Sequence, residues 1–353
     1  MRLDLTQDVA ALTQAIVDVE SVSGDERALA DAIEEALRAL PHLTVERDGD
    51  TVIARTTQGR SERVVIAGHI DTVPINHNLP SRVEGDRLYG CGTGDMKAGV
   101  AVQLKLATLP ETNRDVTYFF YECEEVEESR NGLKRIGDTR PELLEADFAV
   151  LMEPSGGIIE GGCQGTIRVE VAVPGERAHS ARSWMGSNAI HNAGAVLDIL
   201  RTYEPSRPVV DGLEFREGLN AVFISGGVAG NVIPDECLVT LNYRFAPDKS
   251  LQDAEKHLRE LFDGYDVTVV DGAQGARPGL THPAAAAFVE AIGAEGAARA
   301  KLGWTDVARF SALGIPAVNF GPGEPSLSHT RDEYVEIPRI FAGEERMRAW
   351  LTA

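Results

Sequence analysis

Residues 63–74 read RVVIAGHIDTVP, and this stretch decides the fold. The apolar run 64–67 is rich in β-branched residues, which predicts a buried strand that ends at Gly68. His69 and Asp71 follow two positions apart, so their side chains lie on the same side if the chain stays extended. That spacing suits a carboxylate that orients a metal-binding imidazole. The alternative is a strand-end turn in which both side chains are only polar surface.

The composition narrows the class of protein. A length of 353 residues suits two domains, and a formal net charge of -21 opposes nucleic-acid phosphates and anionic membranes as partners. The first 20 residues lack the basic and apolar regions of a signal peptide. The four cysteines are scattered, without a C-x-x-C pair or a disulfide framework. We therefore expect a cytoplasmic protein with reduced thiols.

The N-terminal part alternates between helical and strand patterns. Apolar residues recur at three- and four-residue steps over 4–20 and 25–40, which predicts two amphipathic helices. Short strands joined by a hairpin are predicted near 44–56, ahead of the strand at 64–67. The polar segment 76–86 is predicted to be a loop.

The glycine-rich segment 89–99, YGCGTGDMKAG, precedes a helical pattern. Glycine-rich turns before helices can cradle phosphates, so a dinucleotide site has to be weighed here. The glycines at 90, 92 and 94 are spaced by one residue each, which does not fit that fingerprint, and Asp95 would repel a pyrophosphate. We favour a tight turn that directs Asp95 inward.

Two further apolar strands, predicted at 116–121 and 147–152, are also followed by acids. Glu124 and Glu125 come after the first, and Glu153 comes after the second. A charge run is often only a solvated face or a helix start. In open α/β sheets, however, ligands bind beyond the carboxyl ends of the strands, so these acids can converge with His69.

From about residue 165 the pattern changes to that of a second domain. Strands are predicted at 166–173, 219–228, 236–245 and 266–270, with helices at 187–203 and 250–263. The order strand, helix, strand, strand, helix, strand is that of a ferredoxin-like α+β unit. The first pattern then resumes, with helices at 283–294 and 305–313, a strand at 317–320 and a final helix from about 339.

The expected fold is therefore α/β, with a central mixed sheet flanked by helices and interrupted by a ferredoxin-like domain. The catalytic domain would comprise residues 1–164 and 277–353, and the inserted domain residues 165–276. This organisation lets His329 join the earlier acids despite its distance in sequence. Two histidines, an aspartate able to bridge and two glutamates are the donors that two neighbouring divalent ions need. Zinc suits them best, and cobalt or manganese could serve.

Five ordered motifs resemble the co-catalytic zinc amidohydrolase and metallopeptidase family. That family includes desuccinylases, acetylornithine deacetylase, aminoacylase and glutamate carboxypeptidase. The match spans nearly the whole chain, including the interrupting domain. The motifs are GHIDTVP at 68–74, GTGDMKAG at 92–99, Cys123-Glu124-Glu125, Glu153-Pro154, and His329 followed by Asp332-Glu333.

The resemblance implies a role for each residue of the constellation. Asp95 would bridge the two metal ions, Asp71 would orient His69, and Glu124 would carry a proton between water and the leaving amine. The glutamate run also permits a register shifted by one, and Cys123 stands where the family usually has an aspartate. The implied metal ligands are His69, Asp95, Glu125, Glu153 and His329.

The inserted domain is implied to contribute substrate contacts and a homodimer interface. His179 resembles the family's histidine that steadies an oxyanion, although it could also lie in a surface turn. Asn231, Arg244 and Thr305 resemble substrate-binding positions, and Asn231 could instead satisfy a turn. His191 is expected to pack or lie at an interface.

The pieces Cys-Glu-Glu-x-x-Glu, Arg-Asn-Gly-Leu and Asn-Phe-Gly-Pro-Gly most resemble the desuccinylase branch. This implies hydrolysis of a small anionic amide, N-succinyl-LL-2,6-diaminopimelate, to succinate and LL-2,6-diaminopimelate. An acetylornithine deacetylase or a dipeptidase would share every metal residue. A non-catalytic metal-binding relative would be expected to lack the base or a bridging ligand, and this sequence keeps Glu124, Asp95 and Asp71.

Overall fold

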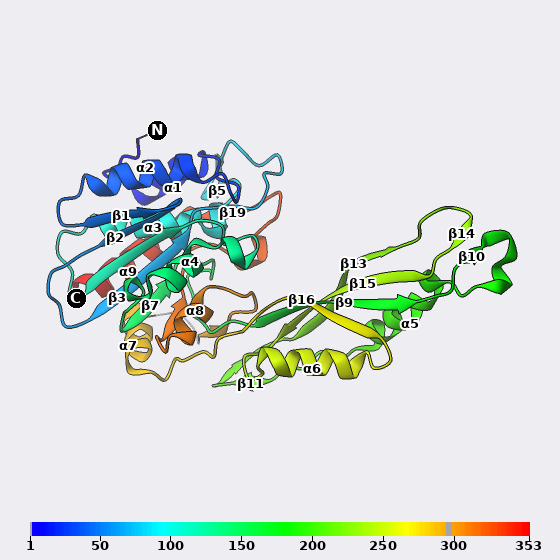
Figure 1. The fold of residues 1–353 in the computed structure, drawn as a ribbon. Coiled ribbons are helices and arrows are strands. Elements are labelled where there is room, and N and C mark those ends of the chain that lie inside the picture. Colours follow the sequence, from blue (N-terminus) through cyan, green and yellow to red (C-terminus); the bar gives the residue numbers. More distant parts are fainter. Residues whose placement is uncertain (1, 294–297) are drawn as a thin grey trace. The chain divides into compact units, whose positions relative to one another are not determined.

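The computed structural model describes residues 2–293 and 298–353, and the chain forms two compact units (Figure 1). Unit 1 comprises Met1–Gly161, Pro278–Arg299 and Arg309–Ala353. Unit 2 comprises Gly162–Arg277 and Ala300–Ala308. Among the described residues, none of the helices combines the length and the apolar character needed to cross a bilayer.

Unit 1 is built around a mixed sheet. Within the described part of the chain the sheet has eight strands in the order β1-β2-β6-β3-β7-β18-β8-β17. Strands β6, β3, β7 and β18 run parallel to their neighbours in that series, whereas β1, β2 and β8 pair antiparallel. The bounds are β1 (Thr44–Asp48), β2 (Thr51–Arg55), β3 (Arg63–His69), β6 (Asp115–Tyr121), β7 (Phe148–Leu151), β8 (Glu160–Gly161), β17 (Arg299–Ala300) and β18 (Ala317–Asn319). The expected mixed α/β architecture is confirmed.

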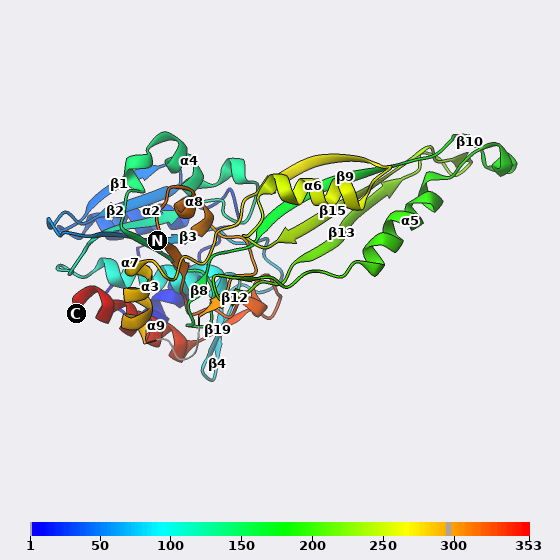
Figure 2. The ribbon, with the colours of Figure 1, turned by 90° about the horizontal axis from the view of Figure 1, so that it is seen from below.

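Helices cover this sheet because its strands are apolar on both faces. Val64 and Ile66 of β3 belong to the main core cluster together with helix residues, while Val65 and Ala67 are buried on the opposite face. Figure 2 shows α4 on the other side of the sheet from α3 and α9. The helices are α1 (Val9–Val17), α2 (Arg27–Arg38), α3 (Ala98–Ala107), α4 (Gly132–Thr139), α7 (Pro283–Ile292), α8 (Val307–Ala312) and α9 (Ile337–Thr352).

Helix boundaries differ from the prediction where a side chain caps the backbone. The first helix begins at Val9 rather than near residue 4, because the Asp8 carboxylate accepts the N–H of Ala11 at 2.8 Å. Helix α4 begins at Gly132, because the Asn131 side chain accepts the N–H of Lys134. Helix α7 is described to Ile292, and its predicted end at residue 294 lies outside the described residues.

A small antiparallel sheet replaces part of the predicted loop at 76–86. Strand β4 (Arg82–Glu84) pairs with β5 (Arg87–Tyr89), and β5 also pairs with β19 (Tyr334–Glu336). The loop prediction was therefore wrong for residues 82–84. These strands are three residues long, and β4 is exposed throughout, so they carry little hydrophobic pattern.

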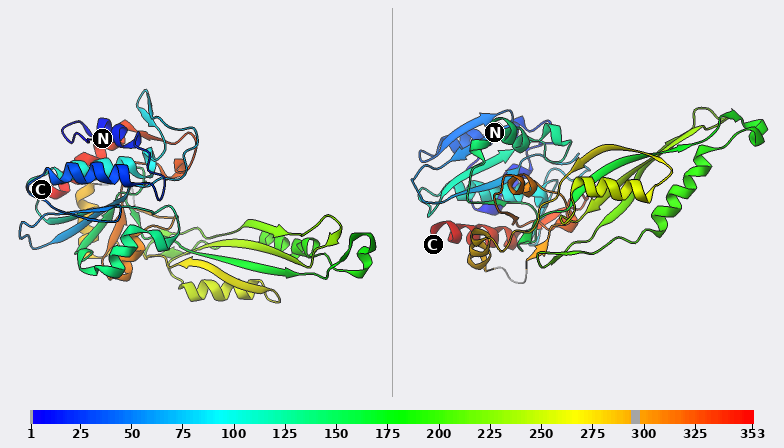
Figure 3. Two further views of the ribbon diagram at one scale, coloured as in Figure 1. Left: turned by 45° about the horizontal axis from the view of Figure 1, so that its top comes forward. Right: turned by 60° about the horizontal axis from the view of Figure 1, so that its bottom comes forward.

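Unit 2 has a four-stranded antiparallel sheet in the order β13-β15-β9-β16, with α5 and α6 on one face (Figure 3). Alternate residues of β9, including Ile167, Val169 and Val171, are buried in one cluster with both helices. The strand order and connections match the expected ferredoxin-like unit. The main elements are β9 (Gly165–Pro174), α5 (Ala189–Thr202), β13 (Gly218–Gly226), β15 (Glu236–Phe245), α6 (Leu251–Leu261) and β16 (Asp266–Ala273). The short ladders are β10 (Ala178–His179) with β14 (Val232–Ile233), and β11 (Val209–Val210) with β12 (Leu213–Glu214).

Candidate metal centre

The parallel strands of unit 1 deliver polar side chains to one edge of the sheet. His69 is the last residue of β3 and pairs with Tyr121, the last residue of β6. On the other side of β3, Ala67 pairs with Leu151 at the end of β7. The acids that follow β6 and β7 therefore leave the sheet beside His69. The convergence expected from the sequence has this strand register as its physical basis.

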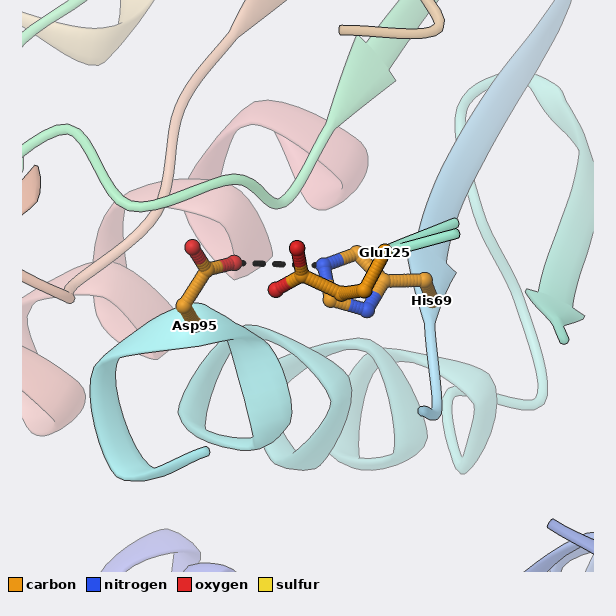
Figure 4. A group of neighbouring side chains, drawn as sticks. All are labelled: His69, Asp95 and Glu125. Atoms are coloured by element: carbon orange, nitrogen blue, oxygen red, sulfur yellow. Dashed lines mark hydrogen bonds and ion pairs between the residues drawn. The ribbon is translucent and has the colours of Figure 1, made fainter. Parts of the chain in front are cut away.

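Three potential ligand groups meet at this edge. Ligand atoms of His69, Asp95 and Glu125 all lie within 4.8 Å of one another (Figure 4). Nε2 of His69 lies 3.1 Å from Oδ1 of Asp95. His329 reaches the same place, since its Nε2 lies 2.8 Å from Oε1 of Glu125 and 3.6 Å from Oδ2 of Asp95. Imidazole and carboxylate donors at this spacing fit the ligands that divalent transition metals take.

Asp71 connects three segments of the site. Its Oδ1 lies 3.4 Å from Nδ1 of His69 and accepts the backbone N–H of Glu124 at 3.0 Å. Its Oδ2 accepts the backbone N–H of Glu125 at 3.1 Å and the hydroxyl of Ser23 at 2.7 Å. Asp71 is fully buried, so these contacts fix the imidazole relative to both glutamates. These contacts support a role for Asp71 in orienting His69, which stays a prediction.

The electrostatics of the site also fit a cation. Burial opposes a charge on His69, but hydrogen bonds to Asp71 and Asp95 outweigh it and raise the pKa of His69 well above its usual range. Burial and the charge of Asp95 raise the pKa of Glu125. Hydrogen bonds to Asp95 and Glu125 raise the pKa of His329 to about 10. The carboxylates that raise the pKa values of the two histidines would also favour a bound cation at the same place.

Asp95 lies in the tight turn that leads into α3. Gly92 has φ 77°, and the Asp95 backbone is extended, with φ -120° and ψ 94°. Lys97 anchors the far side of the turn, because its buried Nζ donates to the carbonyl of Val19 at 2.7 Å. The side chain of Asp95 thereby points toward His69 (Figure 4), as the inward turn predicts.

Glu153 and Glu124 are the remaining predicted members in unit 1. Glu153 follows β7, and its side chain is buried. The backbone at Met152 is packed so closely that a Cβ on Gly99 or Gly321 would clash with the Met152 carbonyl. Glu124 is partly buried next to Glu125. Neither carboxylate belongs to the three-residue group around His69, so a metal or proton role for each stays a prediction.

The other predicted residues lie in unit 2. His179 is exposed, and its Nδ1 accepts the N–H of Ala181 at 3.0 Å. Asn231 lies beside it, because its carbonyl accepts the N–H of Ser180 at 2.9 Å. Arg244 lies on β15 at a half-buried position, and Thr305 is 2% exposed. The structure therefore groups His179 with Asn231.

Several residues that shape the site were not predicted from the sequence. Ser23, in the segment between α1 and α2, donates its hydroxyl to Asp71. Cys123 has φ 55°, a left-handed conformation that no local signal predicts for cysteine. The N–H and thiol of Cys123 both contact Oε1 of buried Glu26, at 3.1 and 3.3 Å. These contacts hold the chain just before Glu124.

Fold and site together define a class: a mixed α/β protein with a candidate histidine and carboxylate site for divalent metal. The chain belongs to the peptidase family M20/M25/M40, which matches residues 65–353. It is 55% identical over 353 residues to a Mycobacterium tuberculosis protein provisionally named succinyl-diaminopimelate desuccinylase DapE, covering 99% of each chain. It is 51% identical over 349 residues to the succinyl-diaminopimelate desuccinylase of Corynebacterium glutamicum, covering 96% of this chain and 94% of that one. The family resemblance read from the motifs is confirmed.

Solved structures share the fold at low sequence identity. A tripeptidase from Staphylococcus aureus superposes with a TM-score of 0.78 at 20% identity, covering 99% of this chain and 98% of that one. The YXEP protein of Bacillus subtilis, described as a dinuclear metal binding peptidase of family M20, has a TM-score of 0.73 at 17% identity, covering 97% and 96% of the two chains. These likenesses establish the architecture.

Proposed function

We propose that this protein hydrolyses the amide bond of N-succinyl-LL-2,6-diaminopimelate, giving succinate and LL-2,6-diaminopimelate. The observation that carries the proposal is the meeting of His69, Asp95, Glu125 and His329 at one sheet edge. The choice of substrate is supported by the names of the relatives at 51% and 55% identity, which align over nearly the full length.

The metal ligands in this proposal are the groups at the sheet edge. Asp95 would be the ligand that both ions share, which is supported by the position of its Oδ1 near His69 and of its Oδ2 near His329. Zinc suits the donors best, with cobalt or manganese as alternatives. Two such ions, when bound, would lower the pKa of a water molecule and polarise the amide carbonyl. The full proposed set is His69, Asp95, Glu125, Glu153 and His329.

Glu124 is the proposed proton carrier. It would take a proton from the attacking water and return it to the amine nitrogen as the carbon–nitrogen bond breaks. Its backbone N–H is held by Asp71, which also contacts His69. The base and one ligand therefore share a single orienting carboxylate.

Unit 2 is proposed to carry the substrate contacts and the dimer interface. His179 would stabilise the oxyanion, and the basic Arg244 with Asn231 and Thr305 would hold the anionic substrate. An edge position and exposed apolar side chains on β13 support pairing with a second copy of this chain. Phe223 is 70% exposed and Ile224 is 53% exposed.

The proposed location is the cytoplasm. The four free cysteines support a reducing compartment of this kind.

The test is the initial rate of the zinc-loaded protein on N-succinyl-LL-2,6-diaminopimelate. N-acetylornithine at equal concentration and a chelator-treated blank serve as controls. Chelator-sensitive turnover of the succinyl compound, with little turnover of the acetyl compound, is the expected result. A metal-loaded protein that leaves the succinyl compound intact would contradict the proposed substrate and direct attention to acetylated amino acids and dipeptides.

A further inference from the structure

Glu333 is a buried carboxylate for which the proposed reaction has no role. It is 2% exposed and lies four residues after His329. Its Oε1 accepts the backbone N–H of Gly94 at 2.8 Å and that of Asp95 at 3.1 Å. Its Oε2 accepts the N–H of Gly92 at 3.2 Å. One side chain therefore satisfies three backbone donors of the turn that presents Asp95.

The small sheet explains how Glu333 comes to this place. Strand β5 ends at Tyr89 just before the Asp95 turn, and β19 begins at Tyr334 just after Glu333. The two tyrosines pair in an antiparallel register, so both connecting segments leave the same end of the ladder. The N–H of Gly90 also donates to the Glu333 carbonyl at 3.1 Å.

A second contact joins the same two segments. Gly323, in the loop that leads to His329, touches the backbone of Gly94, and a Cβ at Gly323 would clash with the Gly94 carbonyl. The turn before α3 and the loop before β19 are thus joined at two points, at Gly94 with Gly323 and at Glu333.

We propose that Glu333 is a positioning residue for the metal centre, holding the Asp95 turn and setting the place of the Asp95 carboxylate relative to His329. This inference rests on the proposed function, since it assumes that Asp95 and His329 bind metal. Glu333 acts on the backbone of the turn, whereas the Asp95 side chain extends to His69.

A carboxylate is the side chain that this position requires. An ionised carboxylate only accepts hydrogen bonds, and its two oxygens can serve three donors at once. Bonds from backbone N–H groups to a charged acceptor are stronger than bonds between neutral groups. Glutamine could keep the two bonds made at Oε1 and would set an amide donor against the Gly92 N–H. Alanine would keep none.

The test compares Glu333→Ala and Glu333→Gln with the unchanged protein in two measurements. Hydrogen exchange would follow the backbone amides of 92–95, and cobalt ion titration with visible absorbance would report metal affinity and coordination. For Glu333→Ala we expect exchange of these amides at least about tenfold faster and a cobalt affinity about 10- to 100-fold weaker, the range found for outer ligand partners. The cobalt spectrum should change, and kcat should fall more than KM rises.

Glu333→Gln should lie between the other two proteins and serves as the comparison if Glu333→Ala does not fold. Glu336→Gln, in the adjoining strand β19, changes a partly exposed side chain that pairs with Arg339, and as the matched control it should leave exchange, cobalt affinity and rate unchanged. Wild-type exchange and cobalt affinity in both Glu333 variants would overturn the inference. A third outcome separates the two proposals. If exchange and cobalt affinity change in the Glu333 variants but none of the proteins hydrolyses the succinyl compound, the positioning role of Glu333 is supported and the proposed substrate is contradicted.

Discussion

Nε2 of His329 lies 2.8 Å from Oε1 of Glu125, which joins residues 204 positions apart in the sequence. His329 also lies 3.6 Å from Asp95. Its side chain is half exposed, whereas His69, the other histidine near Asp95 and Glu125, is buried. Substituting His329→Ala should remove one ligand and leave the His69 side intact. We expect the affinity of one metal ion to fall at least about tenfold. Metal content after dialysis against graded chelator would measure this, and two tightly held ions in the variant would contradict the assignment.

Replacing the proposed proton carrier should separate catalysis from metal binding. Glu124→Gln keeps the size of the side chain and the backbone N–H that Asp71 accepts. The rate should fall about 10²- to 10⁴-fold because the proton carrier is lost, while metal content stays the same. Glu127→Gln, whose side chain is 70% exposed nearby, is the matched control. A near-normal kcat in Glu124→Gln would show that a group other than Glu124 carries the proton.

Substituting Asp71, the proposed orienting carboxylate, should affect both metal binding and catalysis. Asp71→Asn removes a charge that faces His69, and it places an amide donor against one of the two backbone N–H groups of Glu124 and Glu125. Both metal affinity and kcat should fall, each about 10- to 100-fold. Chelator competition would measure the metal affinity, and steady-state kinetics would measure kcat. A loss of kcat with unchanged metal affinity would argue that Asp71 acts on the glutamates alone.

Close packing at the start of α3 predicts an effect on stability. A Cβ on Gly99 would clash with the Met152 carbonyl, which is backbone and cannot easily move. Gly99→Ala should therefore lower the free energy of unfolding by about 1–3 kcal/mol or more. Gly343→Ala, where a Cβ would lie 4.0 Å from Val102, should instead raise it by about 0.5–1 kcal/mol. Denaturant unfolding of both variants gives the comparison, and equal midpoints would refute it.

The proposed dimer interface can be tested through one edge strand. Phe223→Glu places a charge on β13, where the native side chain is 70% exposed, and should shift the protein to a monomer. Val270→Glu makes a similar change on β16, the opposite edge of the same sheet, and should leave the mass unchanged. Light scattering after size exclusion measures both. A dimeric Phe223→Glu variant would place the interface elsewhere.

The sequence predicts the strands of unit 1 well because parallel buried strands read as continuous apolar runs. The same logic locates the acids after β6 and β7, since their positions depend only on where each strand ends. The strand pattern left open which of Glu124 and Glu125 binds metal, and the family resemblance assigned Glu125. That choice depends on the backbone at Cys123, whose φ of 55° is held by Glu26 from another segment. In the structure it is the Glu125 carboxylate that groups with His69 and Asp95.

The short sheet of β4, β5 and β19 marks the limit of sequence interpretation. Three-residue strands bury too few side chains to produce a period, and β19 lies far along the chain from β5. The function of Glu333 depends on that pairing. A motif suggested that an acid belongs near His329, but only the three-dimensional register shows which backbone groups it binds.

The pairing of β5 with β19 also has a consequence for how the protein is made. The Asp95 turn leaves the ribosome long before Glu333 and His329, and the whole of β9 to β16 is synthesised between them. Three backbone N–H groups of that turn must wait for their acceptor until the last part of the chain emerges. A nascent chain that stops before His329 would therefore hold four of the five proposed metal ligands, with the turn that carries Asp95 still unsecured.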